Sequence, residues 1–191
     1  MILTATVLTH PILPCGDIVS IRNIICHCAK KGIYMNKAVL LDLQGTLGGS
    51  GLDDMRTFSF YPFSIPAIKI FNEMGYLVII ITNQSHISKG EFTYSFFEDK
   101  MEELKQKVSQ YGGKIDGVYY CPHTREDKCD CIKPLPGMVF RAKKDFKLKL
   151  SKCYVIGDSG GWDIVLAHRV GAKSILVKTG LGESSLTDYK Y

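Results

Sequence analysis

The sequence lacks any apolar segment of the roughly 20 residues that a membrane-spanning helix needs. Residues 1–16 are apolar, but they lack the basic start of a secretory signal, and Pro11 and Pro14 interrupt them. Internal repeats and low-complexity linkers are also missing. We therefore expect a cytoplasmic protein without membrane contact, and the length of 191 residues suffices for one domain.

Positive charge exceeds negative charge only slightly, with 24 Lys and Arg against 19 Asp and Glu. The excess fits a small phosphorylated metabolite as partner, and charge alone leaves nucleic acid open. One basic run is interpreted as a solvated helix face and loop, not as a nucleic-acid patch. It consists of Arg141, Lys143, Lys144, Lys147, Lys149 and Lys152. We expect a monomer that binds the metabolite and not nucleic acid.

The first 34 residues show neither helical periodicity nor strand alternation. Two interpretations stay open. Met35 is the true start and residues 1–34 are a translated leader, since codons for Lys30-Lys31-Gly32 can contain a ribosome-binding sequence; or these residues are a genuine N-terminal extension, packed on the domain or disordered. We predict the main domain at residues 35–183 and a C-terminal tail at residues 184–191.

From Met35 onward, short apolar segments alternate with helical patterns. The predicted strands are residues 38–42, 76–82, 117–120, 153–156 and 174–177. The predicted helices are residues 64–75, 94–111, 136–146 and 162–170, the second with an apolar stripe of Phe97, Met101, Leu104, Val108 and Tyr111. This order predicts a three-layer, Rossmann-like α/β fold with a parallel sheet and helices on both faces.

Four soft metal ligands lie within eleven residues, at Cys121, His123, Cys129 and Cys131. Three thiolates and one imidazole complete a tetrahedral Zn²⁺ shell with no open position, which predicts a structural zinc site. An ordinary cysteine-rich loop or a disulfide pair is the alternative, and the spacing favours zinc. Because Lys133 follows at once, we expect the zinc-bound loop to set the position of this lysine.

Polar side chains follow the predicted strands at the points where they end. These are Asp42, Thr82 and Asp158, joined by Lys133 from the cysteine loop. Ligands of parallel α/β sheets bind beyond the carboxyl ends of the strands. Carboxylates suit Mg²⁺, while a hydroxyl and a lysine suit a phosphoryl group. A carboxylate that faces a metal-bound phosphate can attack phosphorus and form an aspartyl phosphate.

Several of these segments resemble a known family. Asp42-Leu-Gln-Gly-Thr46-Leu, Ile81-Thr82-Asn83-Gln84-Ser85, Lys133-Pro and Gly157-Asp158 resemble the four motifs of the haloacid dehalogenase-like phosphatase superfamily. The cysteine loop and Lys89-Gly-Glu-Phe-Thr93 resemble the D-glycero-D-manno-heptose 1,7-bisphosphate phosphatase family, with histidinol-phosphate phosphatases as close relatives. The resemblance covers about residues 36–182. Only 40 positions separate Asp42 from Thr82, which leaves no room for an inserted cap domain.

The resemblance implies a role for each motif. Asp42 is the implied nucleophile, and the side chains of Asp42 and Asp158 with the backbone carbonyl of Gln44 are the implied Mg²⁺ ligands. Asp163 is implied to support the metal site. The implied substrate-binding residues are Thr82, Asn83, Gln84 and Lys133, of which Thr82 and Lys133 are also counted with the catalytic residues.

Gln44 departs from the family, whose members carry aspartate there to protonate the leaving oxygen and activate water. A carboxamide cannot do this, and loss of a general acid/base typically slows catalysis by about 10²–10⁴-fold. Three explanations stay open. The protein is a phosphatase that is slow or acts on a good leaving group; it is a binding protein derived from an enzyme; or Gln44 was introduced to trap a complex.

Ile132 is a second departure, because relatives usually carry an arginine that can contact the substrate before the lysine. His86, in place of a glycine, is interpreted as a surface residue. We expect Mg²⁺-dependent hydrolysis of a sugar phosphate, at C7 of a heptose 1,7-bisphosphate, through an aspartyl phosphate and weakened by Gln44. The alternatives are an impaired sugar-phosphate-binding protein, a histidinol-phosphate phosphatase and a polynucleotide 3′-phosphatase.

Overall fold

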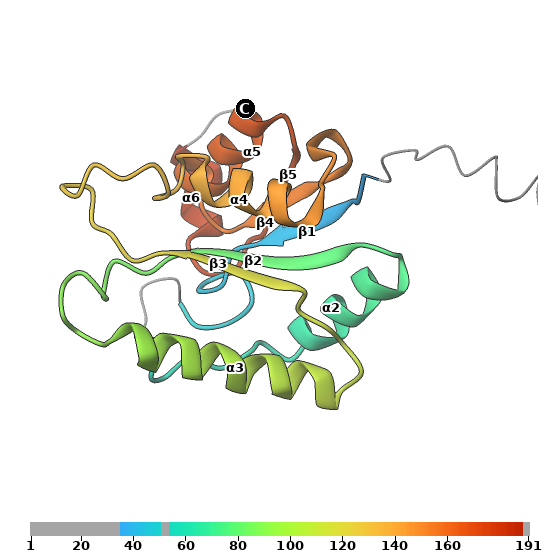
Figure 1. The fold of residues 1–191 in the computed structure, drawn as a ribbon, viewed down its shortest axis with the longest axis horizontal. Helices are drawn as coiled ribbons and strands as arrows, with labels where there is room; N and C mark the ends of the chain where they lie inside the picture. Colours follow the sequence, from blue (N-terminus) through green and yellow to red (C-terminus); the bar gives the residue numbers. More distant parts are fainter. Residues whose placement is uncertain (1–34, 51–53, 189–191) are drawn as a thin grey trace, which may run out of the picture. The chain divides into compact units, whose positions relative to one another are not determined.

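The computed structural model describes residues 35–50 and 54–188. Our two interpretations of residues 1–34 therefore lie outside the described residues. Within the described part, five parallel strands form one sheet in the order β3-β2-β1-β4-β5 (Figure 1). The strands are β1 Ala38–Leu41, β2 Leu77–Asn83, β3 Gly117–Cys121, β4 Tyr154–Gly157 and β5 Lys173–Leu176. This arrangement confirms the predicted α/β fold.

Helices cover both faces of the sheet, with α2 and α3 on one face and α4 and α5 on the other (Figure 1). The α-helices are α2 Ser64–Glu73, α3 Tyr94–Gln110, α4 Gly137–Phe146, α5 Val165–Val170 and α6 Gly182–Asp188. A 3₁₀-helix, η1, spans Leu150–Lys152, and a π-helix, η2, spans Gly160–Ile164. Among the described residues between β1 and β2, α2 is the helix that the chain forms. None of the helices in residues 35–50 and 54–188 is long and apolar enough to cross a membrane.

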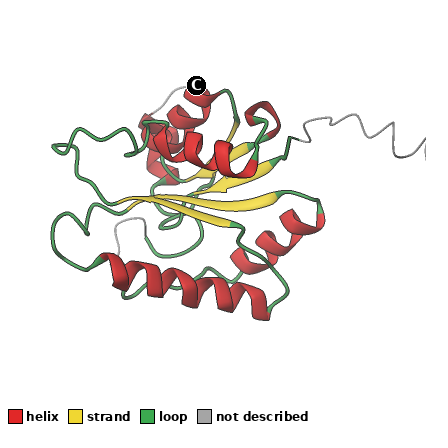
Figure 2. Ribbon diagram, in the orientation of Figure 1, coloured by secondary structure: helices red, strands yellow, loops and turns green. Residues whose placement is uncertain are grey.

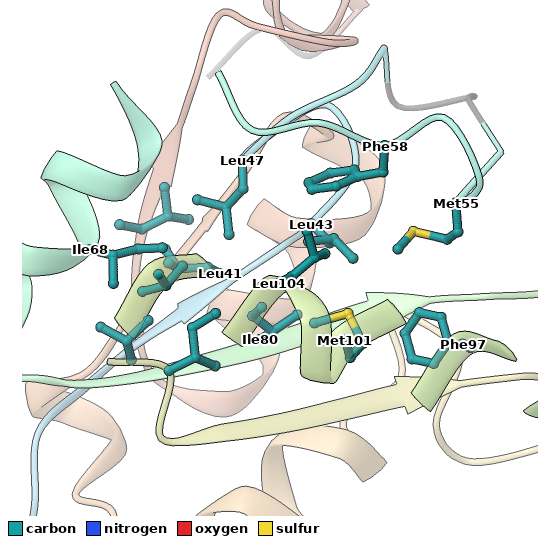
Figure 3. Close-up of a cluster of buried hydrophobic side chains, with 14 of the residues drawn as sticks. Leu41, Leu43, Leu47, Met55, Phe58, Ile68, Ile80, Phe97, Met101 and Leu104 are labelled. Carbon is teal, nitrogen blue, oxygen red and sulfur yellow. The ribbon is translucent and has the colours of Figure 1, made fainter. Parts of the chain in front are cut away.

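Side chains along each strand point alternately to the two faces of the sheet, which divides the interior into two cores. Leu41 and Ile80 point to the face that α2 and α3 cover, while Leu40 and Ile79 point to the α4 and α5 face. Figure 3 shows the first of these cores. Burial of each such side chain contributes roughly 1.5–3 kcal/mol, so both faces of the sheet are strongly specified.

Helix α3 follows its predicted stripe for four of the five positions. Thr93 caps the helix, since its Oγ1 accepts a hydrogen bond from the Phe96 backbone N–H at 3.1 Å. The buried residues of α3 are Phe97, Met101, Leu104 and Val108. Tyr111 differs from our prediction: it follows the last helical residue and is 65% exposed. Gly113 comes directly after this turn and packs against Val108.

Two segments near the C-terminus differ from the predicted pattern. The predicted helix at residues 162–170 begins as the π-helix η2 and continues as α5. The boundary that we predicted between the domain and a tail, at residue 184, falls inside α6. Buried Ser185 of α6 donates a hydrogen bond to the Asp158 carbonyl and accepts one from the Gly160 N–H, both at 3.1 Å. These bonds join α6 to the end of β4.

Candidate active site and metal centre

The parallel strands bring the predicted site residues to one end of the sheet. Asp42 directly follows β1, Asp158 directly follows β4, and Thr82 lies near the end of β2. The Asp42 N–H donates to the Ile156 carbonyl at 3.0 Å, so the pairing of β1 with β4 continues to the first carboxylate. Figure 2 shows the loops that follow β2 and β3 at this same end.

Lys133 lies between two carboxylates. Its Nζ donates to Asp42 Oδ1 at 2.6 Å and to Asp163 Oδ1 at 2.7 Å, and the residue is only 3% exposed. Carboxylate oxygens of Asp42, Asp158 and Asp163 all lie within 4.8 Å of one another. Thus three acidic groups lie together and two of them are bonded to one ammonium group, and this set of carboxylates suits a divalent cation.

Burial and charge set the ionisation of these groups. Burial acts most strongly on Lys133 and lowers its pKa, but Asp163 and Asp42 together outweigh it and hold the pKa above its usual value. Burial raises the pKa of Asp163 to about 7, although Lys133 opposes this. Burial also raises the pKa of Asp158, against the hydrogen bond from the Leu181 N–H. The lysine therefore stays charged and stabilises the neighbouring carboxylates.

Asp158 is held by Leu181, which lies outside the motifs that we recognised in the sequence, and by Thr46, which lies in the first of them. The Leu181 N–H donates to Asp158 Oδ2 at 2.7 Å, and Thr46 Oγ1 donates to Oδ1 at 3.4 Å. Gly180 has a φ of +55°, and a Cβ there would overlap Asp158 Oδ2. The glycines at 180 and 182, just after β5, were the available signal for this turn, and our sequence analysis did not use it.

Asn83 holds the backbone of Lys133. Its Oδ1 accepts a hydrogen bond from the Lys133 N–H at 2.8 Å, and its Nδ2 donates to the Lys133 carbonyl at 3.4 Å. Both ends of the amide are therefore used within the protein. The structure gives Asn83 a positioning contact, and Asn83 also lines the cavity beside Lys133, so the implied contact with substrate stays a prediction.

Gln44, Thr82 and Gln84 form a buried polar chain. Gln84 Nε2 donates to Gln44 Oε1 at 2.8 Å and to Thr82 Oγ1 at 2.9 Å, and Gln84 is fully buried. The side chain of Gln44, at the position where the family has its acid/base, is thus oriented by Gln84. These bonds connect Thr82 to Gln44, while Lys133 joins Asp42 to Asp163 in a separate contact.

The predicted zinc ligands converge in the loop after β3. Nitrogen and sulfur atoms of Cys121, His123, Cys129 and Cys131 lie within 4.8 Å of one another. The shortest contacts are 3.0 Å between the Cys121 and Cys131 sulfurs and 3.3 Å between His123 Nδ1 and Cys131 Sγ. The cysteines in the described residues are free, and the sulfurs are too far apart for a disulfide of about 2.05 Å.

The three cysteines of this cluster differ in pKa, and burial raises the pKa of Cys131. Burial raises the pKa of Cys121, but backbone N–H groups of Ile132 and Cys131 outweigh burial at Cys129 and lower its pKa to about 7. A thiolate therefore forms readily at Cys129, and thiolates are the form that binds zinc. The donor set of three sulfurs and one imidazole nitrogen fits a closed tetrahedral Zn²⁺ site.

His86 belongs to the loop that follows β2. Its Nδ1 lies 2.7 Å from Glu91 Oε2, and its ring stacks on Phe92 at a centroid distance of 5.9 Å. The side chain is 27% exposed. These partners all belong to its own loop, which agrees with our interpretation of His86 as a residue near the surface.

Comparisons with known proteins show which proteins this chain resembles. A HAD-hydrolase-like family model matches residues 130–190. A protein of Pasteurella multocida is 37% identical over 157 residues, covering 76% of this chain and 84% of that protein, and one of Pseudomonas putida is 34% identical over 153 residues, covering 78% and 87%. Both are named D-glycero-beta-D-manno-heptose-1,7-bisphosphate 7-phosphatase.

A solved structure is also similar. It is the D,D-heptose 1,7-bisphosphate phosphatase from B. bronchiseptica, complexed with magnesium and phosphate. The two structures superpose with a TM-score of 0.75 at 28% sequence identity, over 81% of this chain and 87% of that chain.

Proposed function

Because the chain belongs to the family of D-glycero-beta-D-manno-heptose-1,7-bisphosphate 7-phosphatases, within the HAD-like hydrolases, we propose that it is a Mg²⁺-dependent phosphatase that removes the C7 phosphate from a heptose 1,7-bisphosphate. The observation that carries this proposal is that Asp42 and Asp158, at the carboxyl ends of β1 and β4, lie with Asp163 of η2 in one group of carboxylates, and that Lys133 bonds to Asp42 and Asp163. A similar structure that holds magnesium and phosphate supports the same assignment.

The proposed reaction proceeds in two steps. An Asp42 carboxylate oxygen attacks phosphorus, the bond between phosphorus and the C7 oxygen breaks, and an aspartyl phosphate forms. Water then attacks this phosphorus, which releases inorganic phosphate and restores Asp42. The sugar oxygen takes its proton from water, because the Gln44 amide has none to give at neutral pH.

The charges in this site determine its affinity for the phosphoryl group. Side chains of Asp42 and Asp158 and the carbonyl of Gln44 would hold Mg²⁺, which offsets the charge on the phosphoryl oxygens. Lys133 supplies a further positive charge beside the attacking carboxylate. Its two carboxylate partners and the Asn83 amide hold this lysine in place before substrate arrives.

Gln44 tests the proposal most directly. In Gln44→Asp a carboxylate can protonate the leaving oxygen and activate water, so we expect phosphate release to rise at least tenfold, within the roughly 10²–10⁴-fold range of general acid/base catalysis. The measurement is a turnover assay with a panel of phosphorylated metabolites. Gln44→Asn is the matched control, since it shortens the side chain equally but keeps an amide.

The outcomes of this assay separate two functions. If the unchanged chain releases phosphate, and if this release increases in Gln44→Asp but not in Gln44→Asn, the protein is a weakened phosphatase. Saturable binding without release from either form supports the second candidate, a sugar-phosphate-binding protein, which the glutamine at position 44 favours. An equal increase in Gln44→Asn would show that side-chain length, not proton transfer, limits the reaction.

The remaining assignments concern zinc and the setting of the protein. We expect about one Zn²⁺ per chain, held by the four ligands of the cysteine loop and structural in role. The protein acts as a cytoplasmic monomer on a small phosphorylated metabolite, without membrane or nucleic acid. Metal analysis tests the zinc assignment and gel filtration tests the monomer. A zinc-free preparation that is as stable as the zinc-loaded protein would contradict the structural role.

A further inference from the structure

A cavity of about 570 Å³ opens between α2 and α3, and the proposed reaction does not use it. Pockets that hold small molecules typically enclose roughly 300–1,000 Å³, so a ligand of that kind fits here. The described walls come from α2, from the segment just before it and from the C-terminal part of α3 (Figure 1). This described lining shares no residue with the candidate active site or the cysteine loop, so the cavity is a separate feature of the fold.

The aromatic wall before α2 is held in place from behind. The Phe60 ring packs edge-on against buried Phe58 at a centroid distance of 5.5 Å, and Phe60 and Ile65 both pack against the core. The Tyr61 hydroxyl donates a hydrogen bond to the Gly49 carbonyl. These contacts fix the two rings before any ligand arrives, so binding a ligand costs little further ordering of this wall.

Tyr111 supplies a ring that the core does not use. Its spacing predicted a place in the buried stripe of α3, yet the residue is 65% exposed and lines the cavity. A tyrosine ring offers a large and rigid contact surface that loses little side-chain entropy when it binds. Together with Phe60 and Tyr61, it brings three aromatic rings to one cavity, which favours a ligand with a planar aromatic group.

The charged residues of the cavity favour an anion. Lys69 of α2 and Lys107 of α3 line it, and its described lining contains no acidic residue. Neither lysine forms an ion pair within residues 35–50 and 54–188. Glu103, one helical turn before Lys107, is paired instead with Lys100 at 2.9 Å. The two cations beside aromatic rings therefore attract a ring that carries a negative group.

The position of Lys69 brings its charge to the far wall. Its Nζ lies 3.7 Å from the point that a Cβ at Gly112 would occupy, so the side chain reaches from α2 to the end of α3. Gly112 directly follows Tyr111, and the ammonium group is therefore close to the residue that supplies the exposed ring. Charge and aromatic surface thus meet at one end of the cavity.

We propose that this cavity binds a small molecule that combines one planar aromatic ring with one anionic group. The ring contacts Phe60, Tyr61 and Tyr111, and the anionic group faces Lys69 and Lys107. This site is additional to the proposed active site, and its ligand takes no part in the chemical step.

Titration with two matched probes tests the proposal. Indole-3-acetate and indole-3-acetamide share a ring system and differ by one negative charge, and neither contains a phosphate that could enter the site at Asp42 and Lys133. Because small probes bind weakly, binding is followed by NMR amide shifts of the isotopically labelled full chain. We expect the acid to bind about fivefold more tightly at low salt, as for exposed ion pairs, and the preference to fall as salt screens the charges. The shifts should centre on residues 60–69 and 107–112.

Two variants separate the contribution of charge from that of the ring. Lys69→Gln combined with Lys107→Gln should abolish the preference for the acid and leave the affinity for the amide unchanged. Tyr111→Ala should weaken both probes alike, by about fivefold, because it removes aromatic contact surface. Lys144→Gln on α4 and Tyr94→Ala at the start of α3 are the matched controls, since both residues are exposed and neither lines the cavity.

Several outcomes would overturn the proposal. They are equal affinity for the two probes, a preference that persists in the double lysine variant, an equal loss in either control, and no binding of either probe. Shifts centred on Asp42 and Lys133 would also overturn it, because the probe would then occupy the candidate active site.

Discussion

The two polar clusters of this protein are held together in different ways. At the strand ends, the backbone pairing of β1 with β4 brings Asp42 and Asp158 together, and Lys133 offsets their charge from within the protein. The second cluster is the group of candidate zinc ligands. Two of them, His123 and Cys129, lie in the loop after β3, in a segment without helix or strand. The first cluster is a product of the fold, whereas in the second the proposed Zn²⁺ would balance the thiolates that bind it.

The difference shows where each cluster is vulnerable. Like charges a few ångströms apart repel, and in the buried site one lysine relieves this repulsion for two carboxylates. In the loop after β3, residues 122–131 have few backbone bonds of their own, so the proposed Zn²⁺ would supply what backbone bonding does not. The pairing of β1 with β4 should therefore survive loss of zinc, although Lys133 directly follows the cysteine loop, and the loop should survive loss of Lys133.

Lys133→Met is the change with the largest expected effect. It leaves Asp42 and Asp163 buried without their cation, and loss of one partner of a buried ion pair typically costs about 3–5 kcal/mol. Urea unfolding without Mg²⁺ measures this cost. Lys105→Met is the control, because it removes an exposed pair with Glu102, which is worth about 0–1 kcal/mol. Equal costs in the two variants would refute the buried role of Lys133.

Loss of zinc should have an intermediate effect. A ligand at 100 times its Kd stabilises by about 2.7 kcal/mol, so Cys129→Ser should lower Tm by about 5–10 °C in that concentration of zinc. Hydrogen exchange should increase in residues 121–131 and stay unchanged in β1 and β4. Cys153→Ala, a buried cysteine outside the cluster, should keep its zinc. Uniform loss of protection across the sheet would show that the two clusters are not independent.

Gly180→Ala should have the smallest of these effects. A methyl group there overlaps Asp158 Oδ2 and the Gly45 Cα, and such overpacking costs about 1–3 kcal/mol. Gly171→Ala is a matched control, since its φ of +68° imposes similar backbone strain but a Cβ there meets no atom within 4 Å. Thermal unfolding compares the two variants, and Mg²⁺ affinity should fall only in Gly180→Ala. Equal effects would mean that backbone strain alone matters.

Much of the fold was predictable because local patterns and packing agree. The buried strands read as short apolar runs, and α3 carries its stripe at helical spacing up to Val108. Tyr111 matched the spacing but not the burial, because the helix ends before it and periodicity does not mark the end of an element. The π-helix η2 and helix α6 were missed for a related reason: Gly160 of η2 and Asp158 are bonded to Ser185 and Leu181, which are distant in sequence.

The chain's own sequence determined the ligand spacing of the cysteine loop, the order of strands and helices, and the glutamine at position 44. Each of these is a matter of residue type and short-range spacing. Only the tertiary structure decided that Lys133 donates hydrogen bonds to both Asp42 and Asp163, and that Asn83 accepts a hydrogen bond from the Lys133 backbone N–H. These contacts join residues about 30 to 90 positions apart, whose meeting depends on how parallel strands align their ends.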